Sequence, residues 1–389
     1  MYICKFNVFN MEQIQIYQDN VAVSRIVVGD GVSLDGDLGS CLRPYKHVFV
    51  VFDRTAMLKS CVLHELIQKF VCKDIPVKGI EATEASKTID TVMDICSWLL
   101  DVGADRDALV LAVGGGITTD MAGFAASIYK RGVRYANLPT TLLAQVDAAI
   151  GGKTGVNYEK YKNMLGVIRQ PEFTYLCAQV LESLPRRDFL SGAAEMFKTF
   201  VIEDEGMYAR AVSFLKLYAK NSEKTLECCM DELKALIAAA ARVKAGVVSR
   251  DQYEQGERRV LNLGHTFAHA IETLAQRESP VQGYPALSLS GMNVFVTHGE
   301  AVAVGMVLAA RLSDAQRGNG SVGLAERLEA DLKECGLSTT CPYSVADMAE
   351  IMRKDKKAEG GKVHFVLPRD IGKVEIVDLS VDEVVRLMK

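Results

Sequence analysis

The sequence has no long run of apolar residues. Among its 389 residues, no stretch of about 18 consecutive apolar residues occurs, and a membrane-spanning helix needs at least that length. The first residues, MYICKFNVFNMEQ, also lack a basic segment followed by an apolar one, so no secretory signal peptide is expected. These two absences predict a cytoplasmic protein with no membrane partner.

The cysteines lack the spacing of a disulfide framework. Ten cysteines are scattered along the chain, Cys228 and Cys229 are the only adjacent pair, and no C-x-x-C spacing occurs. This distribution is typical of reduced thiols in a cytosolic chain.

An excess of basic residues is absent as well. The chain has 45 lysines and arginines against 49 acidic residues, which gives a net charge of −4. A nucleic-acid-binding domain normally carries a basic patch, so nucleic acid is not an expected partner. Local groups of lysine and arginine can still bind a small anionic molecule.

Short β-rich segments alternate with helical patterns in the first half of the chain. Residues 47–53 and 108–113 are apolar runs typical of buried strands, and residues 87–103 and 120–132 have helical periodicity. This order predicts a parallel, doubly wound α/β sheet. We assign residues 1–180 to such a Rossmann-like domain.

The second half of the chain is rich in helical patterns. After residue 180, four long segments carry apolar residues at helical spacing, and β-rich runs are nearly absent until residues 363–368. We therefore expect a mainly α-helical domain over residues 181–389. Residues 277–297 are polar and turn-rich with two prolines, and we expect them to form an inserted loop between two helices.

Three consecutive glycines, Gly114–Gly116, follow the apolar run 108–113. Thr118, Thr119 and Asp120 come next, and all three are residue types that cap helix N-termini. A helix that begins behind glycines presents free backbone N–H groups to a phosphate, which indicates nucleotide binding. A tight turn between strand and helix is the alternative, and this stretch alone does not decide between them.

Histidines are few and are concentrated in two places. His265 and His269 are four residues apart and so share one helical face, and His298 stands just before another helical segment. The pair is typical of a divalent metal site, but also of hydrogen-bonded imidazoles. A carboxylate ligand could come from Glu195, a lone acid on an apolar helical segment, with Lys198 on the same face.

Six motifs, in order along the chain, resemble the 3-dehydroquinate synthase family. They are GGGITTDMAGFAASIYKRGVRYANLPTTLLAQVDAAIGGKTGVN, KNMLG, LPRRDFLSGAAEMFK, VLNLGHTFAHAIE, HGEAVAVGM and DKKAEGGKVHFVLP. The resemblance extends from about residue 50 to the C-terminus, and the residues before it match only loosely.

The resemblance implies an enzyme activity. The family converts 3-deoxy-D-arabino-heptulosonate 7-phosphate to 3-dehydroquinate and phosphate, a carbon–oxygen lyase reaction of aromatic amino-acid biosynthesis. It implies that NAD takes up a hydride, that phosphate is then eliminated, that the hydride is returned, and that an aldol step closes the ring. It also implies a divalent metal, zinc in the first place and cobalt in the second.

The resemblance also assigns roles to single residues. The implied metal ligands are Glu195, His265 and His298, so His269 does not ligate and is expected to serve proton transfer together with Glu254. Lys198, the third implied catalytic residue, matches a position that binds substrate and could meet an oxyanion. Seven further positions match substrate-binding residues of the family: Arg131, Lys153, Asn163, Lys244, Arg258, Asn262 and Lys356. Eleven match its NAD-binding residues: Asp53, Glu84, Lys87, Gly114, Gly115, Gly116, Asp120, Thr140, Thr141, Asp147 and Lys162.

Some of these positions have a plainer interpretation. Asp53 ends the strand at 47–53, where an acid can bind ribose hydroxyls, but it could be an ordinary turn aspartate. Glu84 and Lys87 could form an ion pair at the start of a helix.

The resemblance further implies a homodimer in which Arg131 reaches the neighbouring subunit's site. The insertion at 277–297 lies between the second and third implied ligands, where the family has a shorter link. Because HGEAVAVGM resumes intact after it, we expect the insertion to bulge outward, where it could act as a lid.

Three other functions stay open. A sugar phosphate cyclase acting on sedoheptulose 7-phosphate or glucose 6-phosphate has no substrate carboxylate to bind, whereas this chain carries Lys244 and Arg258. A glycerol-type metal-dependent dehydrogenase would need fewer cations. A catalytically silent NAD-binding scaffold would have no use for Glu254, Lys198 and His269.

Overall fold

The computed structural model describes residues 11–159, 161–278, 286–289, 292–318, 323–355 and 362–388. The chain divides into two compact units. Unit 1 ends at Leu184 and unit 2 begins at Pro185.

Unit 1 is built on a seven-stranded sheet with the strand order β1-β2-β9-β6-β5-β3-β4. β1 pairs antiparallel with β2, and the other neighbours pair in parallel. The strands are β1 (Glu12–Gln18), β2 (Val21–Gly29), β3 (Val48–Asp53), β4 (Val77–Ile80), β5 (Leu109–Gly114), β6 (Arg134–Pro139) and β9 (Phe173–Cys177).

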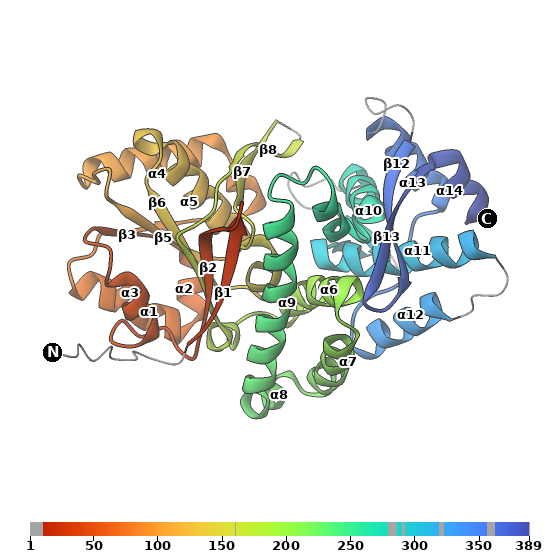
Figure 1. Cartoon of the computed structure of the whole chain (residues 1–389), viewed down its shortest axis with the longest axis horizontal. Helices are drawn as coiled ribbons and strands as arrows, with labels where there is room; N and C mark the ends of the chain where they lie inside the picture. The colour runs from red at the N-terminus through yellow and green to blue at the C-terminus, as the bar shows by residue number, and fades with distance from the viewer. Residues whose placement is uncertain are drawn as a thin grey trace. The chain divides into compact units, whose positions relative to one another are not determined.

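Helices cover both faces of this sheet, which explains why its central strands are apolar throughout. Every residue of β5 is buried, as expected for a parallel strand covered on two sides. In Figure 1, α4 (Ile89–Asp101) and α5 (Gly116–Ile128) lie on one side of the strands, and α1 (Asp37–Leu42) and α3 (Cys61–Cys72) on the other. The predicted doubly wound α/β fold is confirmed.

The direction of winding reverses between β3 and β5. From β3 the chain proceeds outward to β4, whereas from β5 it proceeds to β6 on the other side. Open α/β sheets bind ligands beyond the carboxyl ends of their strands at such a switch point. Asp53 is the last residue of β3 and Gly114 is the last residue of β5, so this point carries residues matched to NAD-binding positions.

The helix after the glycines begins earlier than the sequence predicted. α5 begins at Gly116 with Gly115 as its N-cap, and no side chain caps it. The helix predicted over 120–132 is present, but its start was misplaced: Thr118, Thr119 and Asp120 lie inside the first turns of α5 and do not cap it. The N-terminus of α5 is therefore formed by glycine backbone alone.

Unit 1 also contains a hairpin and several short helical turns. β7 (Lys153–Tyr158) pairs antiparallel with β8 (Tyr161–Ile168). The short turns are η1 (Glu84–Ser86), η2 (Tyr129–Arg131), the π-helical η3 (Ala144–Ala148) and η4 (Ala178–Leu181). Single π-helical turns are frequent at functional sites.

Unit 2 is mainly helical, as predicted for the second half of the chain. Its helices are α6 (Arg186–Glu203), α7 (Glu205–Lys220), α8 (Ser222–Cys228), α9 (Met230–Arg250), η5 (Glu257–Asn262), α10 (His265–Glu278), α11 (His298–Arg317), α12 (Leu324–Glu334), α13 (Val345–Asp355) and α14 (Val381–Leu387). A hairpin of β12 (Lys362–Asp370) and β13 (Lys373–Ser380) completes it.

α11 is the central helix of unit 2. It is rich in alanine, valine and glycine, is buried along most of its length, and packs against α6, α10, α12 and β12. A helix that is apolar on all sides is stable only when it is enclosed in this way. Even so, no helix in the described part of the chain is long and apolar enough to cross a membrane.

The insertion contains regular structure. β10 (Ala286–Leu289) pairs antiparallel with β11 (Met292–Phe295), whereas the sequence predicted only a turn-rich loop. The error arose because the prolines and glycines around these strands outweighed the short β-forming runs ALSL and MNVF. Most of the remaining insertion, and therefore its suggested role as a lid, lies outside the described residues.

Candidate metal centre and cofactor-binding residues

Glu195 is a charged residue at the centre of a buried helix. It lies on α6 with an exposed fraction of 0%, and the Lys198 ammonium, one turn further on, is 2.5 Å from its Oε2. Burial by itself raises the pKa of a carboxyl, but Lys198 and the neighbouring histidines outweigh burial and hold the pKa of Glu195 well below its usual range. The carboxylate is therefore ionised at neutral pH.

His265 is the first residue of α10, and the backbone fixes its ring. Its Nδ1 lies 3.2 Å from the Leu263 carbonyl oxygen. Because a carbonyl only accepts, Nδ1 carries the proton and Nε2 has a free lone pair. Burial, reinforced by the charge of Lys198, lowers the pKa of His265 to about 3. The ring is neutral, as a metal ligand must be.

His298 begins α11, and a capping box fixes this helix start. The Thr297 side chain accepts from the Glu300 backbone N–H, and the Glu300 carboxylate accepts from the Thr297 backbone N–H. The same carboxylate forms a bidentate pair with Arg187 of α6, with nitrogen–oxygen distances of 2.9 and 2.8 Å. The start of α11 at His298 is therefore fixed by contacts that do not involve the insertion.

α6 and α11 cross closely beside His298, and this crossing also fixes the start of α11. The backbone N–H of Gly299 donates to Ser191 Oγ at 3.0 Å, and a Cβ at position 299 would collide with the Ser191 backbone. Only glycine allows α11 to begin this close to α6.

The side chains of Glu195, His265 and His298 converge. Glu195 Oε1 lies 3.8 Å from His265 Nε2 and 3.3 Å from His298 Nε2, and the three candidate ligand atoms are all within 4.8 Å of one another. Two ligands at about 2.0–2.1 Å from a tetrahedral zinc ion stand about 3.3 Å apart. The arrangement is close to what a metal needs.

The donor set also fits a catalytic metal. Both oxygens of Glu195 are buried and receive no hydrogen bond of ordinary geometry, although the Lys198 ion pair partly neutralises them. Two imidazoles and one carboxylate are three protein ligands, which is the number that catalytic zinc sites use when they keep one position open. Zinc or cobalt would be held by Glu195, His265 and His298.

His269 differs from the other two histidines. Its ring centre is 5.6 Å from that of His265, but it is exposed and does not belong to the group of converging ligand atoms. The pairing of His265 with His269 as metal ligands, which their spacing alone suggested, is not what the structure forms.

Glu272 is a residue that the sequence analysis missed. It lies two turns after His265 on the same face of α10, and its Oε1 is 3.5 Å from His298 Nδ1. Burial alone would lower the pKa of His298, but the Glu195 and Glu272 carboxylates outweigh burial and raise it to about 10. Without a metal the ring therefore carries both protons, and a metal would have to displace the one on Nε2. The i, i+4, i+7 spacing of His265, His269 and Glu272 is the signal that could have revealed this glutamate.

Glu254 and Asn262 contact each other directly. Asn262 Nδ2 donates to Glu254 Oε1 at 2.7 Å. Glu254 has a φ of +59°, which is strained for a residue with a side chain and occurs most often at functional sites.

The loop that carries Glu254 closes on Asp251, which the sequence analysis also missed. Its carboxylate accepts from the backbone N–H groups of Gln255, Gly256 and Arg258 at 3.0, 2.7 and 3.0 Å. Burial raises the pKa of Asp251, but these three donors outweigh it and lower the pKa. Arg258 is buried in this loop, and its Nη1 donates to the Gln252 carbonyl at 2.5 Å.

Of the other two predicted substrate-binding lysines in the second half of the chain, the structure describes only Lys244. Lys244 lies on α9 and is buried, with an exposed fraction of 6%. A buried lysine must be paired with other polar groups. Lys356 lies outside the described residues.

In unit 1, Asp53 caps a helix. Its Oδ1 accepts from the backbone N–H groups of Thr55 and Ala56 at 2.8 and 3.3 Å, which makes it the N-cap of α2 (Arg54–Lys59). Burial, only partly offset by these donors, raises its pKa. Asp53 therefore has a structural role as a helix cap. This role uses only Oδ1, so Oδ2 could still accept from a ribose hydroxyl at the switch point.

The glycines at the end of β5 allow close packing by the protein itself. A Cβ on Gly115 would lie 3.0 Å from Thr141 Cγ2, and a Cβ on Gly116 would lie 3.1 Å from Ala148 Cβ. Thr141 and Ala148 therefore pack against the glycines so closely that a side chain at either position would crowd them.

A network joins several predicted cofactor residues. Lys87 Nζ contacts Asp120 Oδ2 at 2.6 Å and Asn163 Oδ1 at 2.5 Å. The Glu84 carboxylate instead accepts from Asn157 Nδ2 at 2.7 Å. An ion pair between Glu84 and Lys87, the plainer alternative, is therefore not what these two residues form.

Asn157 is the centre of this network and was missed in the sequence. Its Oδ1 accepts from the Asn163 backbone N–H at 2.9 Å, and its own N–H donates to the Lys87 carbonyl at 2.9 Å. It therefore fixes both the residues matched to NAD binding and Asn163, which was matched to substrate binding.

The remaining predicted residues of unit 1 are placed as follows. Thr140 is buried, Thr141 accepts from the Ala144 backbone N–H at 3.2 Å, and Asp147 lies in the π-helical turn η3. Lys153, Lys162 and Arg131 are exposed. Arg131 has a φ of +69° in the turn that follows α5.

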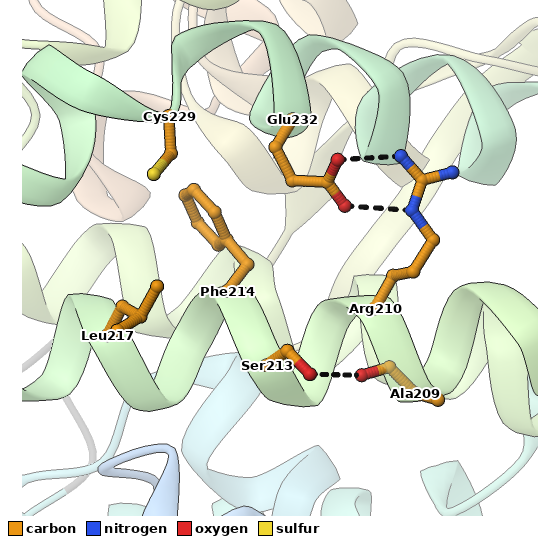
Figure 2. Close-up of a pocket in the computed structure, with 7 residues that line it drawn as sticks. All are labelled: Ala209, Arg210, Ser213, Phe214, Leu217, Cys229 and Glu232. Carbon is orange, nitrogen blue, oxygen red and sulfur yellow. Dashed lines mark hydrogen bonds and ion pairs between the residues drawn. The ribbon is translucent and has the colours of Figure 1, made fainter.

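A surface pocket lies elsewhere in unit 2. Figure 2 shows it between α7 and α9, lined by Phe214, Leu217 and Cys229 and flanked by the Arg210–Glu232 ion pair. The two charged residues satisfy each other at 2.9 and 2.6 Å. None of the predicted site residues lines this pocket, so it is not the candidate site.

The sequence matches known families and relatives over most of its length. The family model described as 3-dehydroquinate synthase N-terminal matches residues 78–191, and the model described as 3-dehydroquinate synthase C-terminal matches residues 192–358. The 3-dehydroquinate synthase of Acidithiobacillus ferrooxidans is 42% identical over 301 residues, which are 76% of this chain and 75% of that protein.

Solved structures share the fold over nearly the whole chain. The 2-epi-5-epi-valiolone synthase from Streptomyces hygroscopicus, solved with NAD⁺ and Zn²⁺ bound, is 26% identical with a TM-score of 0.78, and the match covers 95% of this chain and 96% of that one. A 2-deoxy-scyllo-inosose synthase is 23% identical with a TM-score of 0.72, covering 97% and 99%. From the family models and the curated relative, the chain belongs to the 3-dehydroquinate synthase family.

Proposed function

We propose that the chain converts 3-deoxy-D-arabino-heptulosonate 7-phosphate to 3-dehydroquinate and phosphate. The reaction consists of a transient oxidation by NAD, elimination of phosphate, re-reduction and an intramolecular aldol closure. This makes the protein a carbon–oxygen lyase of the shikimate pathway. The observation that carries the proposal is the convergence of Glu195, His265 and His298 beside a buried Lys198, in a chain of this family.

NAD is the proposed redox cofactor, and residues 1–180 are the proposed NAD-binding domain. A related cyclase binds NAD⁺ together with Zn²⁺. The start of α5 at Gly115 and Gly116, which no side chain caps, together with Asp53 at the same switch point, supports this role. Asp120, Lys87 and the predicted residues near them would bind or orient the nucleotide.

Zinc, with cobalt as the second choice, is the proposed metal of the helical domain at residues 181–389. When bound, it would supply a Lewis acid that withdraws charge from the hydroxyl oxygen on the substrate carbon that is oxidised. Glu195 and Lys198 contribute opposite charges to the same buried place, so Lys198 is suited to hold an oxyanion of the substrate.

Proton transfer is assigned to groups outside the metal ligands. His269 is exposed near the ligand His265 and can exchange a proton with substrate and water. Glu254, held in a strained conformation and bonded to Asn262, is the second candidate for this role. Lys244 and Arg258 are the cations proposed to bind the substrate carboxylate.

The alternatives predict different substrates. A cyclase for sedoheptulose 7-phosphate or glucose 6-phosphate has no carboxylate to bind, and the buried Lys244 and Arg258 favour an acidic substrate. A metal-dependent dehydrogenase does not eliminate phosphate. A silent scaffold has no need for the Glu195–Lys198 pair or for His269.

Two further proposals concern the assembly and location of the protein. The chain is proposed to form a homodimer in which Arg131, exposed on its turn, reaches the site of the neighbouring subunit. The absence of a long apolar run supports a cytoplasmic location.

The proposal is tested with purified protein, NAD⁺, Zn²⁺ and the heptulosonate phosphate. We expect equal amounts of phosphate and 3-dehydroquinate without net formation of NADH, because the hydride is returned. A chelator should abolish the reaction and added Zn²⁺ should restore it, except in a His298→Ala variant. Net NADH accumulation without phosphate release would instead indicate a dehydrogenase.

A further inference from the structure

We propose that Glu272 is a positioning residue of the metal centre: its carboxylate accepts a hydrogen bond from the Nδ1–H of His298 and so leaves Nε2, which faces Glu195, as the nitrogen that binds a metal. This inference rests on the proposed metal ligands, and it gives Glu272 a role that neither the sequence motifs nor the comparisons assign.

The geometry places the His298 ring between two carboxylates. Its Nε2 is 3.3 Å from Glu195 Oε1, and its Nδ1 is 3.5 Å from Glu272 Oε1. A neutral imidazole carries one proton, and the hydrogen bond at one nitrogen decides which nitrogen is free to bind a metal. Glu272 therefore selects the tautomer that a metal centre at Glu195 requires.

The other ligand histidine obtains the same selection in a different way. His265 Nδ1 contacts the Leu263 carbonyl at 3.2 Å, so its orientation depends on the backbone. His298 instead depends on the side chain of Glu272. A single substitution can therefore release the ring of His298, whereas no side-chain substitution removes the acceptor of His265.

Glu272 is neither a ligand nor a solvated surface acid. It is absent from the group of ligand atoms that lie within 4.8 Å of one another, so it does not reach the metal position. Its side chain is only 10% exposed, and a carboxylate is retained in such a place only when it has polar or charged partners.

The position of Glu272 on α10 links the two ligand-bearing helices. It lies two turns after His265, and it contacts the first residue of α11. α10 therefore supplies one ligand itself and orients the ligand that α11 supplies. The charge of Glu272 also supports the cation: together with Glu195, it gives two carboxylates to offset Lys198 and a divalent ion.

The test measures metal binding directly, apart from catalysis. Zn²⁺ affinity of the full-length protein is obtained by competition with a chromophoric chelator, and Co²⁺ is added separately to record its visible absorption bands. The variants are Glu272→Gln, which keeps the shape but removes the charge, and Glu272→Asp, which keeps the charge but shortens the reach. Glu203→Gln is the control, because Glu203 lies on α6 but pairs with Arg250 at 3.6 Å.

We expect Glu272→Gln to weaken Zn²⁺ binding about 10–100-fold, the usual cost of altering the partner of a ligand histidine, because the amide oxygen is a weaker acceptor and carries no charge. Its Co²⁺ bands should shift, because a misoriented imidazole changes the ligand field. Glu272→Asp should lie between Glu272→Gln and wild type, and Glu203→Gln should equal wild type. Circular dichroism of the metal-free proteins checks that each variant is folded.

A His298→Ala variant distinguishes a failure of the proposed metal centre from a failure of the proposed role of Glu272. If it binds Zn²⁺ like wild type, the proposed metal centre is wrong. If it loses binding while Glu272→Gln keeps wild-type affinity and Co²⁺ bands, the role of Glu272 is overturned and the metal centre stands. Should Glu272→Gln be recovered unfolded, Glu272→Asp decides by the same measurement: weaker binding supports the role, and unchanged binding contradicts it.

Discussion

The three histidines of α10 and α11 differ at the scale of single residues in what surrounds them. His265 and His298 are held at one nitrogen by a carbonyl and by a carboxylate, respectively, and both face Glu195. His269 is exposed and stays outside the ligand group. These different surroundings support the proposal that His265 and His298 bind a metal and that His269 transfers protons.

Replacing His269 with alanine tests this division. Turnover should fall by about 10²–10⁴-fold, the range for loss of a general acid or base. The affinities for NAD⁺ and Zn²⁺ should stay within a factor of two or three, since His269 is not assigned to either site. Steady-state rates and two titrations measure these quantities, and equal losses in turnover and cofactor affinity would contradict the assigned role.

Replacing Asp251 with asparagine tests the loop of Glu254 and Arg258. Three backbone N–H groups lower the pKa of Asp251 in the folded protein below its unfolded value, so its carboxylate stabilises the fold above pH about 4 and this contribution is lost as pH falls through the folded pKa. At pH 7 the variant should lose about 2 kcal/mol of unfolding free energy.

Denaturant unfolding at several pH values measures this loss. The difference between Asp251→Asn and wild type should shrink as pH falls below about 4, because the wild-type carboxyl then becomes neutral too. Glu257→Gln is the control from the same segment, since its ion pair with Arg250 is exposed and worth little. A loss that stays constant from pH 7 to pH 3 would contradict the account.

At the scale of elements, the proposed metal ligands are fixed where helices begin or cross closely. His265 and His298 are both first residues of helices, α10 and α11. Gly264 has a φ of +77°, and a Cβ there would lie 2.8 Å from the Met306 backbone nitrogen. Gly305 approaches the Gly264 carbonyl so closely that it has no room for a Cβ.

Gly305→Ala tests whether this crossing positions His265. The added methyl group meets backbone rather than a flexible side chain, so we expect a loss of about 2–3 kcal/mol in unfolding free energy. Zn²⁺ affinity should fall as well, because Gly264 precedes the ligand. Gly206→Ala on α7 is the control, since its Cβ would have an ordinary 3.5 Å contact. If Gly305→Ala is destabilised but its Zn²⁺ affinity is unchanged, the crossing stabilises the fold without positioning His265.

The sequence predicted elements well where apolar periodicity was strong and less well where local preferences competed. β3, β5 and α4 begin within two residues of their predicted starts. The start of α5 was misplaced because capping preferences pointed to residues 118–120, whereas the close contacts of Gly115 and Gly116 set the real start.

The residues of the candidate site also differ in how far the sequence could predict them. The convergence of Glu195, His265 and His298 could be anticipated because all three lie in long family motifs, and Glu272 could have been found from its spacing to His265. Asn157 could not have been predicted, because its hydrogen bond to Glu84 joins residues 73 positions apart and depends on the folded position of β7. The contacts of Asn157 exist only in the folded protein, and no local sequence pattern indicates them.

At the scale of the whole molecule, the proposed homodimer makes a prediction about mixed subunits. Arg131→Ala and His269→Ala should each be nearly inactive as pure proteins. After subunit exchange, each mixed dimer contains one site with an intact His269 and a partner's intact Arg131. Activity should return to about a quarter of the wild-type value, because half of the dimers are mixed and one of two sites in each is complete.

The control for this experiment is a mixture of Glu254→Gln and His269→Ala. Both residues are assigned to the same subunit's site, so mixing them should restore nothing. Recovery in this control, or no recovery with Arg131→Ala, would contradict the role of Arg131 in the neighbouring site.

The central claim is that this chain acts on an acidic seven-carbon phosphate. The most direct measurement compares phosphate release from the heptulosonate phosphate and from sedoheptulose 7-phosphate, with NAD⁺ and Zn²⁺ present in both. The account predicts release only from the acidic substrate and its loss in the presence of a chelator. Release only from sedoheptulose 7-phosphate would contradict it and would overturn the roles given to Lys244 and Arg258.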